Sequence, residues 1–146
     1  IAQLDTIQKS NFPEPINYIS DFEGIFTDKQ ITELNTLLEQ HEKETTNQIA
    51  VVTIKSYEPY QTLFDYSLDL SNEWGVGQKD KDNGVTIVFG KTIREIRIHV
   101  GFGLEDKLTD EEAKYIIDNV IIPEFKKDDY YSGIHKGLLQ IINEIK

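Results

Sequence analysis

The segment KDKDNGVTIVFGKTIREIRIHVGFGLEDKLTD, residues 79–110, has the strongest strand pattern in the chain. Residues 85–89 form a short apolar run between two glycines, as expected of a buried strand. Residues 96–100 then alternate apolar and polar side chains, the pattern of a strand with one buried face. The intervening residues 90–92, Gly-Lys-Thr, favour a short antiparallel turn. The segment therefore predicts a β-hairpin.

Carboxylates stand at one end of this predicted hairpin. Asp80 and Asp82 precede the first strand, and Glu105, Asp106 and Asp110 follow the second. An antiparallel pair places the start of one strand beside the end of the other, so we expect these side chains to lie close together. Such a cluster repels itself unless a cation, protons or water screen it, and hard oxygen ligands suit Ca²⁺ or Mg²⁺. The hairpin end is thus a candidate divalent-cation site.

The composition of the chain limits the kinds of partner and site that are expected. The chain has 146 residues and a formal net charge of −11, which suits one acidic domain and makes nucleic acid an unlikely partner. Divalent cations or cationic partners are favoured, although the charge could also serve solubility alone. The absence of cysteine excludes disulfides, thiolate metal sites and a cysteine nucleophile.

Nothing in the sequence predicts a membrane span, because no segment approaches the roughly 20 apolar residues that a spanning helix needs. Methionine is also absent, so residue 1 is not an initiator. A cleaved leader and an excised fragment both remain open.

Periodicity along the chain predicts one domain over residues 18–146, preceded by an extended arm over residues 1–17. Segment 18–26 is either a short edge strand or a packed loop, and segment 48–54 is a central strand. Capping boxes, prolines and apolar stripes predict four helices: 28–44, from Pro59 to Trp74, from Thr109 to Pro123, and from about Tyr130 onward. This order predicts an α/β sandwich of two or three layers around a small mixed sheet.

Other motifs fail on spacing. In the loop that begins at Asp80, glycine comes fifth instead of sixth, which excludes an EF-hand. A dinucleotide fingerprint from Gly101 would need its third glycine at Asp106. The three histidines are scattered without paired spacing, and no serine lies in a GxSxG elbow. A solvated turn at Asn83-Gly84 remains the alternative to a cation loop.

Five segments together resemble the TPM domain family: YISDFEGIFTDKQ, QIAVVTI, WGVGQKDKDNGVTIVF, RIHVGFGLEDKLTD and IIPEFKKDDYYSGI. The similarity runs from about Tyr18 to the C-terminus. It implies a Rossmann-like α/β sandwich and an acidic pocket for calcium or another divalent ion. Some members are acid phosphatases of modest activity, others are non-catalytic partners, and many bacterial members are exported.

The resemblance also implies ligand positions. The family's acidic residues match Asp21, Asp82, Glu105 and Asp129, although Asp128 stands here where the family has glycine. The hairpin argument adds Asp80 and Asp110. The expected metal ligands are therefore Asp21, Asp80, Asp82, Glu105, Asp110 and Asp129.

These expectations lead to three hypotheses for the function. The first is a monomeric calcium-binding or other divalent-cation-binding module that interacts with or regulates an unidentified protein, with an exported or cell-envelope location favoured over the cytoplasm. The second is a metal-dependent acid phosphatase, ranked lower because the sequence offers no convincing nucleophile or general-base pair. The third is an adaptor whose acidic cluster is only a solvated rim.

Overall fold

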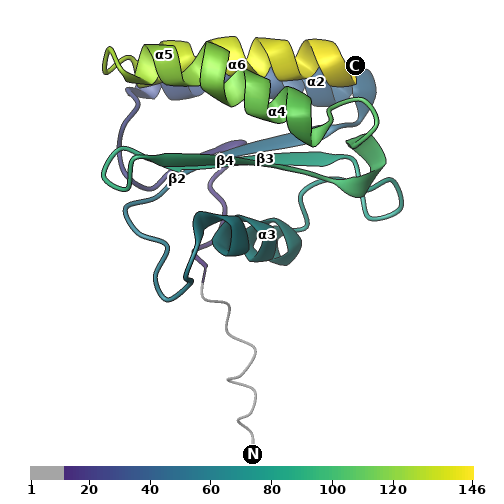
Figure 1. Ribbon diagram of the computed structural model, residues 1–146. Helices are drawn as coiled ribbons and strands as arrows, with labels where there is room; N and C mark the ends of the chain where they lie inside the picture. Colours follow the sequence, from purple (N-terminus) through teal and green to yellow (C-terminus); the bar gives the residue numbers. More distant parts are fainter. Residues whose placement is uncertain (1–11) are drawn as a thin grey trace, which may run out of the picture.

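A four-stranded mixed sheet forms the middle layer of the computed structural model, which describes residues 12–146 (Figure 1). Its order is β1-β2-β3-β4. The first three strands are parallel and β4 is antiparallel to β3, as the predicted hairpin requires. The strands are β1 (Ile19–Asp21), β2 (Gln48–Thr53), β3 (Gly84–Gly90) and β4 (Glu95–Val100).

Helices cover both faces of the sheet, so the sandwich has three layers (Figure 1). One face carries α2 (Asp28–Thr45), α4 (Asp110–Ile116), the π-helical turn η2 (Ile117–Ile121), α5 (Ile122–Phe125) and α6 (Tyr130–Ile145). The other face carries α3 (Leu63–Trp74). A short 3₁₀ turn, η1 (Phe102–Leu104), follows β4. No helix within residues 12–146 is long and apolar enough to cross a bilayer.

Residues 1–11 of the predicted N-terminal arm lie outside the described part of the chain. Residues 12–17 form no helix or strand, yet they contact the domain. The ring of Phe12 meets that of Tyr66 edge-on at 5.1 Å, and the indole nitrogen of Trp74 donates to the carbonyl of Pro13 at 3.0 Å. This part of the chain therefore lies against α3.

Local signals explain where most helices begin. Thr27 with Gln30, and Thr109 with Glu112, form complete capping boxes at the starts of α2 and α4. The prediction that Pro59 opens the next helix is wrong, because α3 begins at Leu63. Thr62 supplies the N-cap there, since its hydroxyl accepts the backbone N–H of Asp65 at 3.1 Å.

The prediction that Pro123 ends the third helix is also wrong. The helical path continues through it to Phe125, but the turn before it widens to the π form, in which the N–H of Ile122 donates to the carbonyl of Ile117. Proline has no N–H and its ring crowds the carbonyl four residues earlier. A single wide turn accommodates that conflict without ending the helix.

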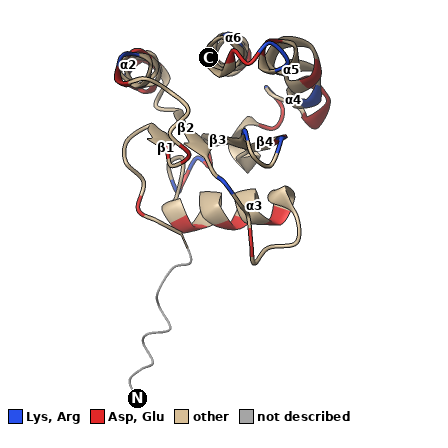
Figure 2. Cartoon of the chain, turned by 90° about the vertical axis from the view of Figure 1, so that its left-hand side faces the viewer, with Lys and Arg blue, Asp and Glu red and all other residues tan. Residues whose placement is uncertain are grey.

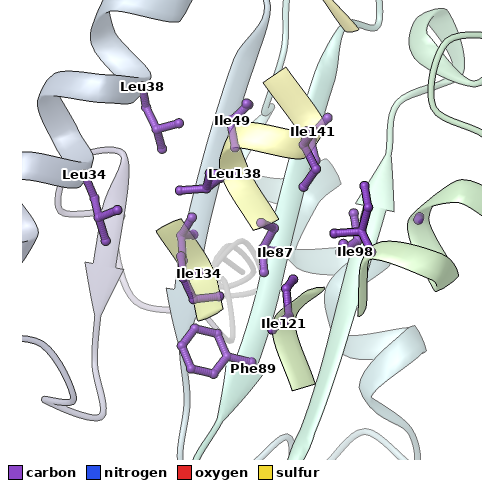
Figure 3. Packing of buried hydrophobic residues seen from close by; sticks show 14 of the residues in the cluster. Leu34, Leu38, Ile49, Ile87, Phe89, Ile98, Ile121, Ile134, Leu138 and Ile141 are labelled. Carbon is purple, nitrogen blue, oxygen red and sulfur yellow. The ribbon is translucent and has the colours of Figure 1, made fainter. Parts of the chain in front are cut away.

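The main core lies between the sheet and the larger helical layer (Figure 3). All seven residues of β3 are buried, and Phe89 near its end packs against Phe26 and Phe125. On α6, a Cβ at Gly133 or Gly137 would press into side chains of α5 and η2. Both glycines therefore let α6 approach that helical run closely.

The packing of the core predicts that two adjacent leucines of α6 contribute very differently to the free energy of unfolding. Leu138 is fully buried, whereas Leu139 is 47% exposed. Leu138→Ala should lower the free energy of unfolding by about 2–5 kcal/mol, because it removes buried methyl groups and leaves a cavity. Leu139→Ala should change it by less than about 0.5 kcal/mol. Urea denaturation of both variants checks this, and equal losses would contradict the packing described.

Candidate functional site

The six expected ligands do not gather around one point. In the sheet, Asp21 lies level with Thr53, and Thr53 with Phe89, which places Asp21 at the carboxyl end of the parallel strands. Asp82 precedes Gly84 at the opposite end of β3. The seven residues of β3 span about 20 Å at 3.3 Å per residue, so one ion cannot bind both carboxylates.

Asp21 uses both carboxylate oxygens to hold the loop between β1 and α2. Its Oδ1 accepts the hydroxyl of Thr53 at 2.7 Å and the N–H of Ile25 at 3.0 Å. Its Oδ2 accepts the N–H of Phe26 at 2.9 Å. A carboxylate that accepts several such bonds has a clear structural role.

Glu23 fixes the same end of the sheet, and sequence reasoning did not single it out. Its Oε1 accepts the N–H of Lys91 at 2.7 Å, and its Oε2 accepts the N–H and hydroxyl of Thr92 at 3.0 and 2.7 Å. The hairpin turn is thereby tied to the β1–α2 loop. The partners are 68 and 69 residues apart, so no local motif could have indicated them.

Two more expected ligands lie at helix starts. Asp129 caps α6, where its Oδ1 accepts the N–H of Ser132 at 3.0 Å. The bonds to Ser132, with weaker help from Lys136 and Lys127, lower the pKa of Asp129. Asp110 is the first residue of α4, where its negative charge interacts favourably with the helix dipole. Both carboxylates therefore have structural roles of their own.

The remaining expected ligands lie on two touching loops at the amino end of β3, residues 79–83 and 101–106, called here the acidic loop pair. Asp82 has a positive φ of 49°, and its Oδ2 accepts the N–H of Phe102 at 3.1 Å. A Cβ on Gly101 or Gly103 would collide with carbonyl oxygens of the first loop. The two glycines are thus needed for close loop contact, and not for a positive φ.

Asn83 anchors the acidic loop pair to the rest of the domain. It is 4% exposed, and its Nδ2 donates to the carbonyl of Thr46 at 3.1 Å and to Oδ1 of Asn47 at 3.2 Å. Its own Oδ1 accepts the N–H of Gln78 at 2.7 Å. The Asn-Gly pair therefore forms a buried polar junction, and the solvated turn that was the alternative is excluded for Asn83.

Beside this junction is a hollow of about 410 Å³, lined by Ser71, Asn72, Gly75, Val76, Gly77, Gln78, Lys79, Asp82, His99 and Gly101. Burial lowers the pKa of His99, and Arg97 adds to this, whereas the charges of Asp82 and Glu105 act in the opposite direction. Both carboxylates therefore lie close enough to influence His99. Asp82 and His99 line the same hollow, whereas Glu105 is not among its lining residues.

Asp80 is exposed on the first loop of the pair. Within residues 12–146, no group of three or more His, Cys, Asp or Glu side chains is close enough to enclose a metal ion. Ca²⁺ takes six to eight oxygen ligands and accepts waters among them, so a cation at the acidic loop pair would need most of its ligands from water.

Comparison with known proteins gives the family. The model of the TPM domain matches residues 19–144. The chain belongs to the TPM domain family. This confirms the resemblance inferred from the sequence, and none of the curated proteins compared matches the chain.

Solved structures share the TPM fold. The solution structure of the N-terminal domain of a P. gingivalis protein is 30% identical, with a TM-score of 0.80, and the match covers 88% of this chain and 81% of that chain. BA42 from the psychrophilic bacterium Bizionia argentinensis is 19% identical, with a TM-score of 0.72 and coverage of 85% and 83%. The N-terminal domain of cg2496 from Corynebacterium glutamicum is 14% identical, with a TM-score of 0.68 and coverage of 94% and 86%. The α/β fold is therefore shared with these domains.

The geometry of this TPM domain predicts how His99 titrates. We expect its pKa below the usual 6.5, because burial and Arg97 disfavour the imidazolium. Asp82→Asn should lower that pKa further, since it removes a charge that favours the protonated ring. Asp128→Asn should leave it unchanged, because Asp128 lies in the turn between α5 and α6. Imidazole shifts measured by NMR against pH check this, and a rise in Asp82→Asn would contradict it.

Proposed function

We propose that this TPM domain is an interaction module that binds a divalent cation, calcium in the first place, at the acidic loop pair. The observation that carries the proposal is the contact between the two acidic loops at the amino end of β3. There Oδ2 of Asp82 accepts the N–H of Phe102, and Gly101 and Gly103 pack against carbonyl oxygens of the first loop, with Glu105 exposed on the second. Oδ1 of Asp82 accepts no hydrogen bond from residues 12–146, so it is available to a cation. Asp80 adds a further exposed carboxylate on the same loop.

Electrostatics favour such binding. The chain has a net charge of −11, which attracts cations. The two acidic loops are tied together by a backbone hydrogen bond, in which the N–H of Gly103 donates to the carbonyl of Asp82 at 2.9 Å. A bound cation would offset the repulsion between the carboxylates and order both loops. Asp21, Asp110 and Asp129, although expected as ligands, are not part of this proposed site, because each has a structural role elsewhere in the domain.

The partner-binding part of the proposal comes from Phe102. Its side chain is 78% exposed, although it lies on the second loop of the pair and its N–H is held by Asp82. Exposed aromatic side chains on ordered turns are common contacts at protein interfaces. A cation at Asp82 would therefore stiffen the turn that presents Phe102 to a protein partner. An exported or cell-envelope location belongs to this proposal and is supported by the family resemblance.

A calcium titration of metal-stripped protein, followed by amide NMR, tests the cation site. We expect saturable shifts confined to residues 79–84 and 99–106, lost in Asp82→Asn and weakened in Glu105→Gln. Asp128→Asn is the matched control, because Asp128 is also exposed and has a positive φ of 63°. Asparagine tolerates that backbone conformation, so both variants should fold.

Two results would count against the cation site. One is a set of weak shifts over all acidic residues, which would indicate a solvated rim. The other is unchanged binding in Asp82→Asn. Magnesium, titrated in parallel, separates a calcium preference from general divalent binding.

Acid phosphatase activity is the second candidate, favoured by the position of His99. The sequence offered no general base, yet His99 lines the hollow together with Asp82 and Lys79. Burial lowers the pKa of His99 and so favours its neutral form, which is the form that can accept a proton from water. Ser71 also lines the hollow, but its hydroxyl makes a buried hydrogen bond with the hydroxyl of Thr86, at 2.9 Å. This bond engages the Ser71 hydroxyl within the core. A bound cation would polarise a phosphoryl oxygen.

Hydrolysis of p-nitrophenyl phosphate in the presence of Ca²⁺ or Mg²⁺ tests this second candidate. If His99 is the base, His99→Gln should lower kcat by about 100-fold or more. His135→Gln is the control, since His135 stacks on Tyr131 in α6. Turnover that is equal in all three proteins would exclude His99 as the base, and no turnover in any would leave the interaction module as the function.

A further inference from the structure

We propose that a second site, between β4 and the α4–α5 helical run, binds a small organic anion with an apolar body. A hollow of about 380 Å³ lies there, within the range typical of small-molecule sites. Figure 2 shows α4 and α5 on the side of the sheet where β4 is the edge strand. The lining residues are Gly90, Arg94, Glu95, Ile96, Ile117, Ile122, Phe125, Lys126 and Tyr130.

Aromatic rings form one wall of this hollow. The rings of Phe125 and Tyr130 lie 4.7 Å apart, and Phe89 packs behind Phe125 at 5.1 Å. Phe89 is fully buried in the core, so the wall is continuous with the rigid interior of the domain. An apolar ligand would thus meet a preformed surface, which reduces the entropy that binding costs.

The π-helical turn also contributes to the lining of this hollow. Ile117 begins this turn and Ile122 follows it, and both side chains line the hollow. A π turn is wider than an α turn and occurs often at functional sites. Here the wide turn directly precedes Pro123, through which the helical path continues, so the local sequence explains why this part of the lining does not follow an ordinary α-helix.

Two cations border the hollow without forming an ion pair to any of residues 12–146: Arg94 and Lys126. Of the nearby carboxylates, Glu124 is ion-paired, whereas Glu95 lines the hollow and keeps its negative charge. Glu124 pairs with Lys136 at 3.0 Å and Lys127 at 3.8 Å, and Glu95 accepts the hydroxyl of Tyr57 at 2.9 Å.

Lys91 adds a third positive charge, since its ammonium lies 5.9 Å from the centre of the Tyr130 ring. In a chain of net charge −11, these cations make the rim locally attractive to anions. An arginine beside an apolar wall suits a carboxylate in particular, because its guanidinium donates two parallel hydrogen bonds. The ligand we infer is therefore a carboxylic acid with an aliphatic or aromatic body.

Octanoate is a suitable probe, with octanol as its uncharged counterpart and octylammonium as its cationic one. Titration of the calcium-free protein, followed by amide NMR, should give saturable shifts at Ile96, Ile117 and Tyr130 with octanoate. Arg94→Gln with Lys126→Gln should weaken octanoate binding about tenfold or more, the effect of losing charge-assisted hydrogen bonds. Both residues are exposed, so the double variant should keep the native spectrum.

Lys107→Gln is the matched control, because Lys107 is an exposed cation in the turn before α4, outside the residues that line this hollow. It should leave octanoate binding unchanged. Equal binding of octanoate and octanol, or equal loss in the control and the double variant, would overturn the proposal of an anion site. Shifts that remain absent or unsaturated with all three probes would overturn the site itself.

Discussion

The complete burial of β3 is the constraint on which the rest of the domain depends. All seven of its residues are buried, it pairs with β2 on one side and β4 on the other, and helices cover both of its faces. A strand in that position has its backbone groups bonded on both sides and has little room for polar side chains. Polar chemistry along the centre of the sheet is therefore limited to the two ends of this strand.

Those two ends use their polar residues differently. At the carboxyl end, where open α/β sheets commonly bind ligands, Asp21 and Glu23 are committed to backbone and hydroxyl hydrogen bonds that tie loops together. At the amino end, Asn83 makes the corresponding structural bonds, and the carboxylates around it remain exposed. Structural and ligand-accessible acids are thus separated by the length of one strand.

Much of this architecture could be predicted because its signals are local. The alternation in residues 96–100, the apolar run before it and two capping boxes each depend on neighbours within a few residues. The helix start at Thr62 was missed because Pro59 offered a stronger single-residue signal. The passage through Pro123 was missed because tertiary packing of α5 against α6, close at Gly133, outweighs the intrinsic cost of proline.

The site could be predicted only in part, because it depends on strand order. The contact between the loop of Asp82 and the loop that follows β4 could be predicted, because an antiparallel hairpin places the start of β3 beside the end of β4. Asp21 was placed with them by family resemblance, but β1 runs parallel to β2 and so carries Asp21 to the far end of the sheet. His99 was assigned no role, because the sequence shows neither the burial that lowers its pKa nor the hollow that it lines.

A comparison of Asp21 with Asp82 shows which negative charge the fold needs. Asp21 uses both oxygens for three hydrogen bonds, and an amide there would lose an acceptor. At Asp82, asparagine would tolerate the positive φ equally well, and its single oxygen could still accept the N–H of Phe102. The negative charge at Asp82 is therefore more than its contacts within the fold require, in contrast to the charge at Asp21.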